Sequence, residues 1–211
     1  MNPLWTPAQI DEGVPARDVL PALRAILRWS KGHLTAPHPA LGRSGPVCPY
    51  TAPALRRDLL RFTVATMTAT GQALHRLMSR MRLAYAEHAS GLKDAERELL
   101  AYLIVLPRVD PLDAAGLNRV QEGLKDEFVA DGLMVGQFHP RCDEPGLWNH
   151  AYRPLRSPVP LLAIRQMRDV DLPFLTESGH LRSYFERFTA GLPVRVRGQL
   201  VHRLTGTEAT P

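Results

Sequence analysis

The chain has 211 residues, of which 45% are hydrophobic and 22% are charged, and this composition excludes a wholly disordered protein. The formal net charge is +5, but the arginines are scattered and no run of like charges or aromatic recognition motif indicates a nucleic-acid partner. Two cysteines are too few for a secreted disulfide framework, and neither a signal peptide nor an apolar stretch of about 18 residues is visible, so we expect a cytoplasmic protein without a membrane span.

The first half of the chain is expected to be helical around one irregular segment. Residues 1–14 are interpreted as an arm or lid, and helical spacing predicts a helix over 15–32. Five prolines and two glycines break the pattern over 36–53, which predicts stiff, irregular chain. Helical spacing then returns over 54–90, as one long helix or two short ones.

The second half alternates short apolar runs with amphipathic segments. Compact apolar runs predict buried strands over 99–106 and 133–138. Helical spacing predicts helices over 111–131, from 161 to 167 and over 179–191. A second irregular segment, 139–160, again contains five prolines. Residues 192–203 are ambiguous, and 205–211 are expected to be a loose tail.

These elements predict an α+β fold: a mainly helical single domain over 15–204, with a few short strands and two long, ordered, proline-rich loops. Loops longer than about 12–15 residues within a compact domain are usually functional or disordered. Apolar and aromatic residues such as Leu41, Tyr50 and Trp148 argue against disorder. We therefore expect the functional site where the two segments lie, and the meeting of the segments in space is a hypothesis.

Cys48 is the candidate metal ligand of the first segment. It is followed by Pro49, which removes a backbone donor and stiffens the chain that presents the sulfur. A thiolate is a strong nucleophile and a soft metal ligand, and Cys-Pro dipeptides occur where cysteine ligates haem iron. The dipeptide is weak on its own, because most cysteines are small buried hydrophobes.

His139 is the candidate catalytic residue of the second segment. It follows a predicted strand and precedes a proline, so its side chain would be presented at the end of a regular element. An axial ligand, a distal acid or base and a simple turn residue all stay open for it. A mononuclear site of Cys48, His139, Cys142 and His150, or a disulfide between the two cysteines, is a further alternative, although the paired spacing typical of structural zinc sites is missing.

Arginines accompany both segments and are candidates for binding anionic groups. Guanidinium groups bind carboxylates or phosphates with two parallel hydrogen bonds. Ordinary surface ion pairs are the alternative for each of them. The candidates are Arg43, Arg153, Arg156 and Arg165. His75 and His88, on the predicted 54–90 element, are interpreted as surface or core-edge histidines.

Several well-known catalytic signatures are absent from the sequence. It contains no GxGxxG, GxxxxGK[ST], HExxH or GxSxG motif and no evident pair of catalytic carboxylates. Nucleotide-dependent, zinc-protease and serine-hydrolase functions are therefore disfavoured.

Three pieces of the sequence, in this order, carry a resemblance to a known family: HPALGRSGPVCPY, GLMVGQFHP and YRPLRSPVPLLAIRQMRDVDLPFL. Over roughly residues 36 to 188 the chain resembles small actinobacterial proteins of peptide natural-product clusters, similar to the cyclopropane-forming enzymes that act on 6-nitronorleucine in hormaomycin and belactosin biosynthesis. The resemblance implies a haem b cofactor and oxidation of a modified amino acid. It also implies Cys48 as the proximal thiolate, His139 as a distal group or alternative ligand, and Arg156 and Arg165 against propionates or substrate.

The sequence thus leads to the expectation of a haem-dependent oxidoreductase of natural-product biosynthesis. Its expected site comprises Cys48 as metal ligand, His139 as catalytic residue, and Arg43, Arg156 and Arg165 as cofactor-binding residues. An amino-acid substrate, a redox partner or peroxide, and no nucleic acid or membrane are expected, while a homodimer stays open. The alternatives are a non-catalytic binding module and a haem-free enzyme that uses the Cys48 thiolate directly.

Overall fold

A computed structural model describes residues 3–68, 71–111 and 114–205. At its centre lies one four-stranded sheet formed by β1 (Leu60–Val64), β2 (Ala101–Val105), β3 (Leu133–Phe138) and β4 (Leu161–Gln166). The strand order is β1-β2-β4-β3, and β1 and β2 run parallel while β4 is antiparallel to both neighbours. This mixture of helices and one sheet confirms the α+β class.

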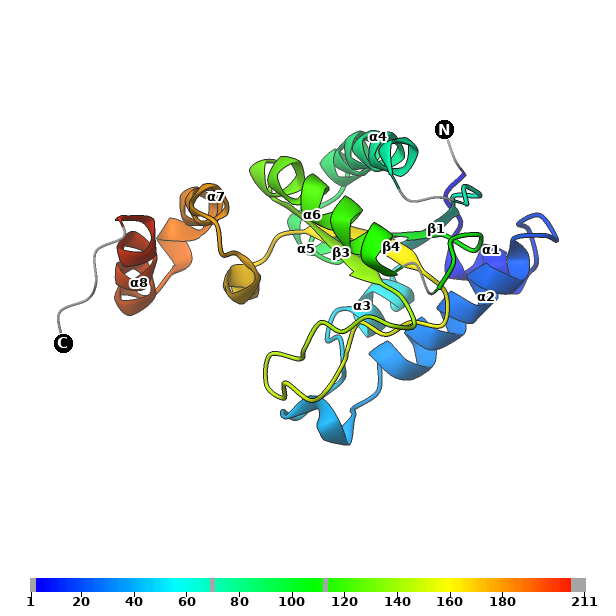
Figure 1. Ribbon diagram of the computed structural model, residues 1–211, viewed down its shortest axis with the longest axis horizontal. Helices are drawn as coiled ribbons and strands as arrows, with labels where there is room; N and C mark the ends of the chain where they lie inside the picture. Colours follow the sequence, from blue (N-terminus) through cyan, green and yellow to red (C-terminus); the bar gives the residue numbers. More distant parts are fainter. Residues whose placement is uncertain (1–2, 69–70, 112–113, 206–211) are drawn as a thin grey trace.

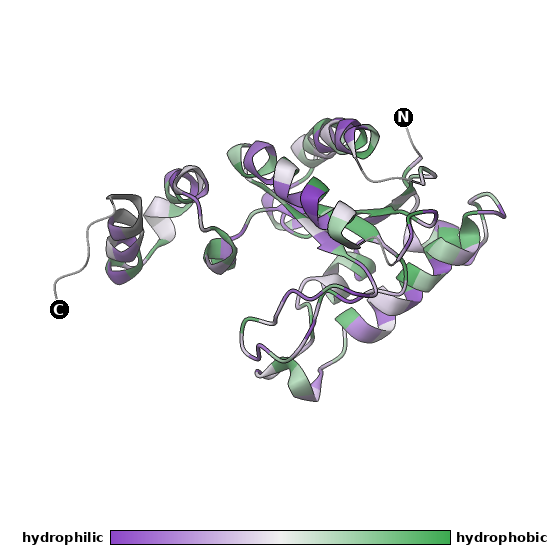
Figure 2. Ribbon diagram, viewed as in Figure 1, coloured by the Kyte–Doolittle hydropathy of each residue, from purple (hydrophilic) through white to green (hydrophobic). Residues whose placement is uncertain are grey.

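Helices cover both faces of the sheet (Figure 1). On one face lie α4 (Gln72–Ser90) and α6 (Ala114–Ala130), and on the other lie α1 (Pro7–Asp11), α2 (Leu20–Trp29) and α3 (Thr51–Arg56). The short helix α5 (Asp94–Arg97) precedes β2. The strands are largely apolar, whereas the helices carry polar residues on their outer sides (Figure 2), as expected for a sheet buried on both faces.

The chain ends in a smaller helical unit beside the sheet. It comprises η3 (Asp169–Phe174), α7 (Ser178–Phe188), η4 (Thr189–Gly191) and α8 (Val194–Thr205), and Figure 1 shows it reaching away from the sheet. A second hydrophobic cluster attaches it to the main domain through Val129 of α6 and Met134 of β3, which pack with Leu181 and Tyr184 of α7. No helix in the described ranges is long and apolar enough to cross a membrane.

One predicted helix is a strand in the structure, and another is divided by a strand into α3 and α4. The predicted 54–90 helix is interrupted because Asp58 adopts a positive φ of 53°, after which Leu60–Val64 forms β1 and pairs with β2. The helix predicted from 161 to 167 is β4, which lies between β2 and β3 and is therefore apolar on both faces. Such a strand lacks the alternation of apolar and polar residues that would identify it, so its sequence also fits a buried helix.

The remaining helix and strand predictions are confirmed in type. Strands lie within 99–106 and 133–138, and helices lie within or across 15–32, 111–131 and 179–191, while the ambiguous 192–203 belongs to α8. Residues 3–14, expected as an arm, pack on the main body: Trp5 forms a β-bridge with Phe62, and Ile10 is fully buried in the main core. The predicted tail lies outside the described residues after Thr205.

Candidate functional site

The two irregular segments meet on one side of the sheet, as hypothesised (Figure 1). The Asn149 side-chain amide donates a hydrogen bond of 2.9 Å to the carbonyl oxygen of Ala40, which lies 109 residues earlier in the chain. The rings of His38 and Tyr152 stack with centroids 4.6 Å apart. The second segment, 139–160, contains no helix or strand, whereas the first contains the short 3₁₀ helix η2 (Pro39–Leu41), and its last residues begin α3.

A π-helix supports this junction. Helix α2 continues directly into η1 (Ser30–Leu34), and π-helical turns are rare and frequently found at functional sites. The π-turn carries His33, whose ring stacks on Trp29 and whose Nε2 lies 3.4 Å from the Tyr152 hydroxyl. His33 also meets His38 edge to face at 6.0 Å. We call His33, His38 and Tyr152 the junction cluster.

Two members of the junction cluster, His33 and Tyr152, are uncharged around neutral pH. Burial, and secondarily the neighbouring His38, lowers the pKa of His33, so its imidazole is neutral. Burial raises the pKa of the Tyr152 hydroxyl, which therefore keeps its proton. The backbone amide of Ala40 donates to Nδ1 of His38 at 3.2 Å, which places the proton of a neutral His38 on Nε2. His33 and Tyr152 can thus donate and accept hydrogen bonds without a net charge.

Cys48 lies next to this junction. Its backbone N–H donates to the carbonyl oxygen of Leu34, the last residue of the π-turn, at 2.8 Å, and its thiol is free and partly exposed. Cys142 is also free, so the described chain has no disulfide between them, but it is fully buried, and burial raises the pKa of its thiol. Cys48 is therefore the cysteine that a cofactor or substrate can reach.

Arg165 is close to Cys48 but is bound by another protein group. Its guanidinium makes two hydrogen bonds of 2.6 Å to the carboxylate of Asp171, whose side chain is 1% exposed. Burial opposes the charge, but Asp171 outweighs it and raises the pKa of Arg165, with smaller contributions from Cys48 and Tyr50. The neighbouring Arg168 covers the ring of Tyr50 at 3.8 Å. Arg165 of β4 is therefore a cation near Cys48 whose two guanidinium NH₂ groups are already bound to Asp171.

The other arginines predicted from the sequence also have partners within their own segments. The Arg43 guanidinium donates to the carbonyl oxygens of Ser44, Pro46 and Val47. Arg156 donates to the carbonyl oxygen of Cys142 and to the carboxylate of Asp143. Arg153 donates to carbonyl oxygens of its own segment. Their observed role is to hold the shape of the two segments.

His139 is placed against α6 rather than against Cys48. It is 1% exposed, and its Nε2 lies 3.1 Å from the side-chain oxygen of Asn118, while its buried Nδ1 has no hydrogen-bond partner. Burial lowers the pKa of His139, with Asp143 opposing it weakly, so its imidazole is neutral. His139 therefore contacts α6, whereas Cys48 contacts the end of the π-turn.

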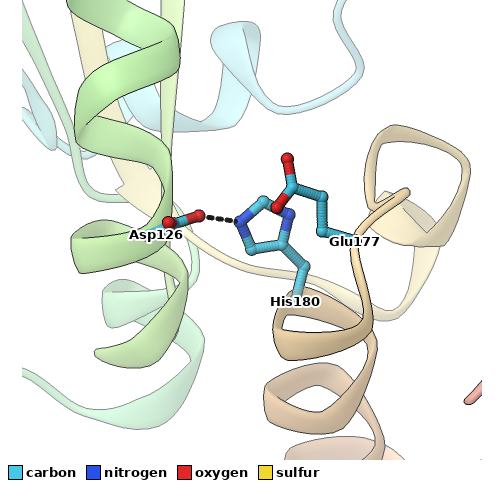
Figure 3. Close-up of side chains that lie close together, drawn as sticks. All are labelled: Asp126, Glu177 and His180. Carbon is cyan, nitrogen blue, oxygen red and sulfur yellow. Dashed lines mark hydrogen bonds and ion pairs between the residues drawn. The ribbon is translucent and has the colours of Figure 1, made fainter.

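The predicted four-ligand alternative is not assembled. Among the described residues, no three of Cys48, His139, Cys142 and His150 bring ligand atoms within 4.8 Å of one another. The side chains that do so are Asp126 on α6 with Glu177 and His180 at the start of α7 (Figure 3). Sequence reasoning missed this cluster, although the Glu-x-x-His spacing of Glu177 and His180 at the start of a predicted helix was a usable signal.

One known family matches most of the chain. Residues 23–199 match the model of a domain of unknown function, DUF6875. The chain therefore belongs to this family, whose description states no activity. No curated protein and no solved structure matches the chain.

Proposed function

We propose that the protein is a haem-dependent oxidative tailoring enzyme acting on a modified amino acid, with Cys48 as the iron ligand. The observation that carries the proposal is the placement of Cys48: a free, partly exposed thiol beside the junction of the two segments, anchored to the end of the π-turn. Thiolate ligation of haem iron favours cleavage of an O–O bond, the chemistry needed to oxidise an unactivated carbon. The family resemblance given by the sequence is the reason for choosing haem over other thiolate-bound groups.

The residues fit this cofactor in part. Cys48 supplies the donor, and Trp29 and Tyr50 lie on the adjoining elements, but one face of each ring is already covered, by His33 and by Arg168. The expected propionate partners are less suitable, because Arg165 is held by Asp171 and Arg43 by backbone carbonyl oxygens. Their cofactor-binding role stays a prediction that requires them to exchange these partners. The proposal therefore rests on Cys48 and the junction cluster.

The junction cluster suits a small zwitterionic substrate. A neutral His33 and the hydroxyl of Tyr152 can each accept from an ammonium group or donate to a carboxylate. When bound, haem would supply oxidation with peroxide or reduced dioxygen. In ring closure to a cyclopropane, two C–H bonds break and one C–C bond forms, and the two hydrogens with their electrons reduce peroxide to two waters. The protein's part is to orient the carbon chain and exclude solvent.

The direct test is haem titration of the full chain, comparing wild type, Cys48→Ser and the matched control Cys142→Ser. We expect stoichiometric binding with a Soret band in wild type and in Cys142→Ser, and loss or displacement of that band in Cys48→Ser. Binding by Cys48→Ser with an unchanged spectrum would overturn the assignment of the ligand. A wild-type protein that takes up no haem would overturn the cofactor.

A non-catalytic binding module is the second candidate, and one observation favours it. In the second segment, Leu147 is 48% exposed and Trp148 is 67% exposed, and such adjacent large apolar side chains are typical of contact surfaces. A colourless wild-type protein with an intact fold would favour this module or a haem-free enzyme using the Cys48 thiol. For either function we propose a cytoplasmic location, which the two free thiols suit.

A further inference from the structure

The cluster of Asp126, Glu177 and His180 lies apart from the junction and brings α6 against the start of α7. The ligand atoms of the three side chains all lie within 4.8 Å of one another. Figure 3 shows Asp126 on one side of the imidazole and the Glu177 carboxylate beside the other side of the ring. Asp126 meets Nε2 of His180 at 2.6 Å.

His180 distinguishes this cluster from an ordinary group of surface carboxylates. Its side chain is 4% exposed, whereas that of Asp126 is 83% exposed. Its Nδ1 is buried without a hydrogen-bond partner, which is costly unless a neighbouring group satisfies it. The carboxylate of Glu177, the N-cap residue of α7, does not cap that helix. A buried imidazole with an unsatisfied nitrogen thus faces a carboxylate that the helix does not use.

We propose that Asp126, Glu177 and His180 form a binding site for a divalent transition metal of the zinc type. One imidazole and two carboxylates match the ligands that Zn²⁺ accepts, at about 2.0–2.2 Å from each donor. The ion would take the place of the hydrogen bond between Asp126 and Nε2, so that the buried imidazole donates through Nε2. The exposed carboxylate of Glu177 can turn in solvent to reach the same ion. Three protein ligands leave at least one coordination position open to water or to an anionic ligand. Mg²⁺, which prefers an all-oxygen octahedral shell, fits less well.

A metal ion bound at this place would connect two parts of the structure. Asp126 belongs to α6, which packs on the sheet, whereas Glu177 and His180 belong to the start of α7 in the C-terminal unit. Leu181 and Tyr184, in the next turn of α7, contribute to the hydrophobic cluster that attaches this unit. A bound ion therefore ties α7 to α6 and adds to the apolar contacts between them. Metal binding is expected to raise the melting temperature of the folded chain.

The test is calorimetric titration of tag-free, metal-stripped full chain with Zn²⁺, with Mg²⁺ as the comparison ion. Wild type is expected to bind one Zn²⁺, with a rise in Tm, and to bind Mg²⁺ far more weakly. Glu177→Gln and Asp126→Asn are each expected to weaken Zn²⁺ binding by at least ~10-fold, since changing a group that only orients a metal ligand already costs about that much. Both substitutions are at exposed positions and should leave the fold intact, which circular dichroism checks.

The matched control is Glu186→Gln, which removes an exposed carboxylate from the same helix outside the cluster and is expected to bind Zn²⁺ like wild type. Cys48→Ser is expected to retain Zn²⁺ binding, which separates this site from the thiol. The proposal is overturned if wild type binds no Zn²⁺, or if Glu177→Gln and Asp126→Asn bind it as tightly as Glu186→Gln does.

Discussion

The contact between the two irregular segments is most sharply tested at Gly42. Gly42 has a φ of +79°, and a Cβ added there would lie 2.9 Å from the backbone carbon and oxygen of Trp148. Gly45, in the same segment, has a similar φ of +88°, but its Cβ would meet nothing closer than an Arg43 nitrogen at 3.5 Å. Gly42→Ala and Gly45→Ala therefore share the backbone strain, and the first adds a clash across the junction.

The expected magnitudes follow from these contacts. A left-handed conformation costs a non-glycine residue about 1–2 kcal/mol, which both variants should lose. In Gly42→Ala, atoms at 2.9 Å must separate by about 0.6–1 Å to reach ordinary carbon contact distances. That shift strains the Asn149–Ala40 hydrogen bond and the packing beside it, so we expect a further loss of about 1–3 kcal/mol.

The assay is urea unfolding of both variants, with acrylamide quenching of tryptophan fluorescence to detect local opening around the partly buried Trp29, which packs against His33 beside the junction. Gly42→Ala should unfold at clearly lower urea than Gly45→Ala, or show greater quenching if only the junction opens. Equal stability and equal quenching in the two variants would refute the contact between the segments.

Two further predictions concern titratable side chains in buried or partly buried places. Asp171→Ala should lower the free energy of unfolding in urea by about 2–3 kcal/mol, because it leaves the Arg165 guanidinium without its carboxylate. The exposed control Asp169→Ala should change the free energy of unfolding little, and equal losses of stability in the two variants would contradict this prediction. Stability should fall as the pH drops below about 6.5, because the unfolded chain then binds protons at imidazoles whose pKa is lowered in the folded state. These are His33, His88 and His139. His139→Gln should flatten that dependence in urea midpoints measured between about pH 5 and pH 7.5, and an unchanged slope would argue against a buried neutral His139.

The fold was predictable where a segment's pattern matched its environment. The apolar run of β2 is bounded by Pro107 and reads as a strand, and α6 has a regular apolar stripe. β4 was mistaken for a helix because a strand buried on both faces has no alternation, and β1 because one residue, Asp58, redirects the chain. Neither the central position of β4 nor the positive φ of Asp58 is visible in a local window.

The two segments that meet were recognisable from their composition, but the partners of their side chains were not predictable. The proline-rich composition identified the two segments, and they do meet. The partners of the arginines depend on tertiary contacts: Asp171 folds back onto Arg165 from the next element, and no spacing rule shows that this carboxylate is buried. His33 was overlooked because a π-turn has the composition of an ordinary helix end.

The central claim, that Cys48 binds haem iron as a thiolate, is tested most directly by the absorption spectrum of the reduced, haem-loaded protein under carbon monoxide. We expect the strongly red-shifted Soret band that distinguishes thiolate-bound from imidazole-bound carbonyl haem. A Soret band without this shift would contradict thiolate ligation and indicate a histidine, and the absence of any haem spectrum would contradict the proposed function itself.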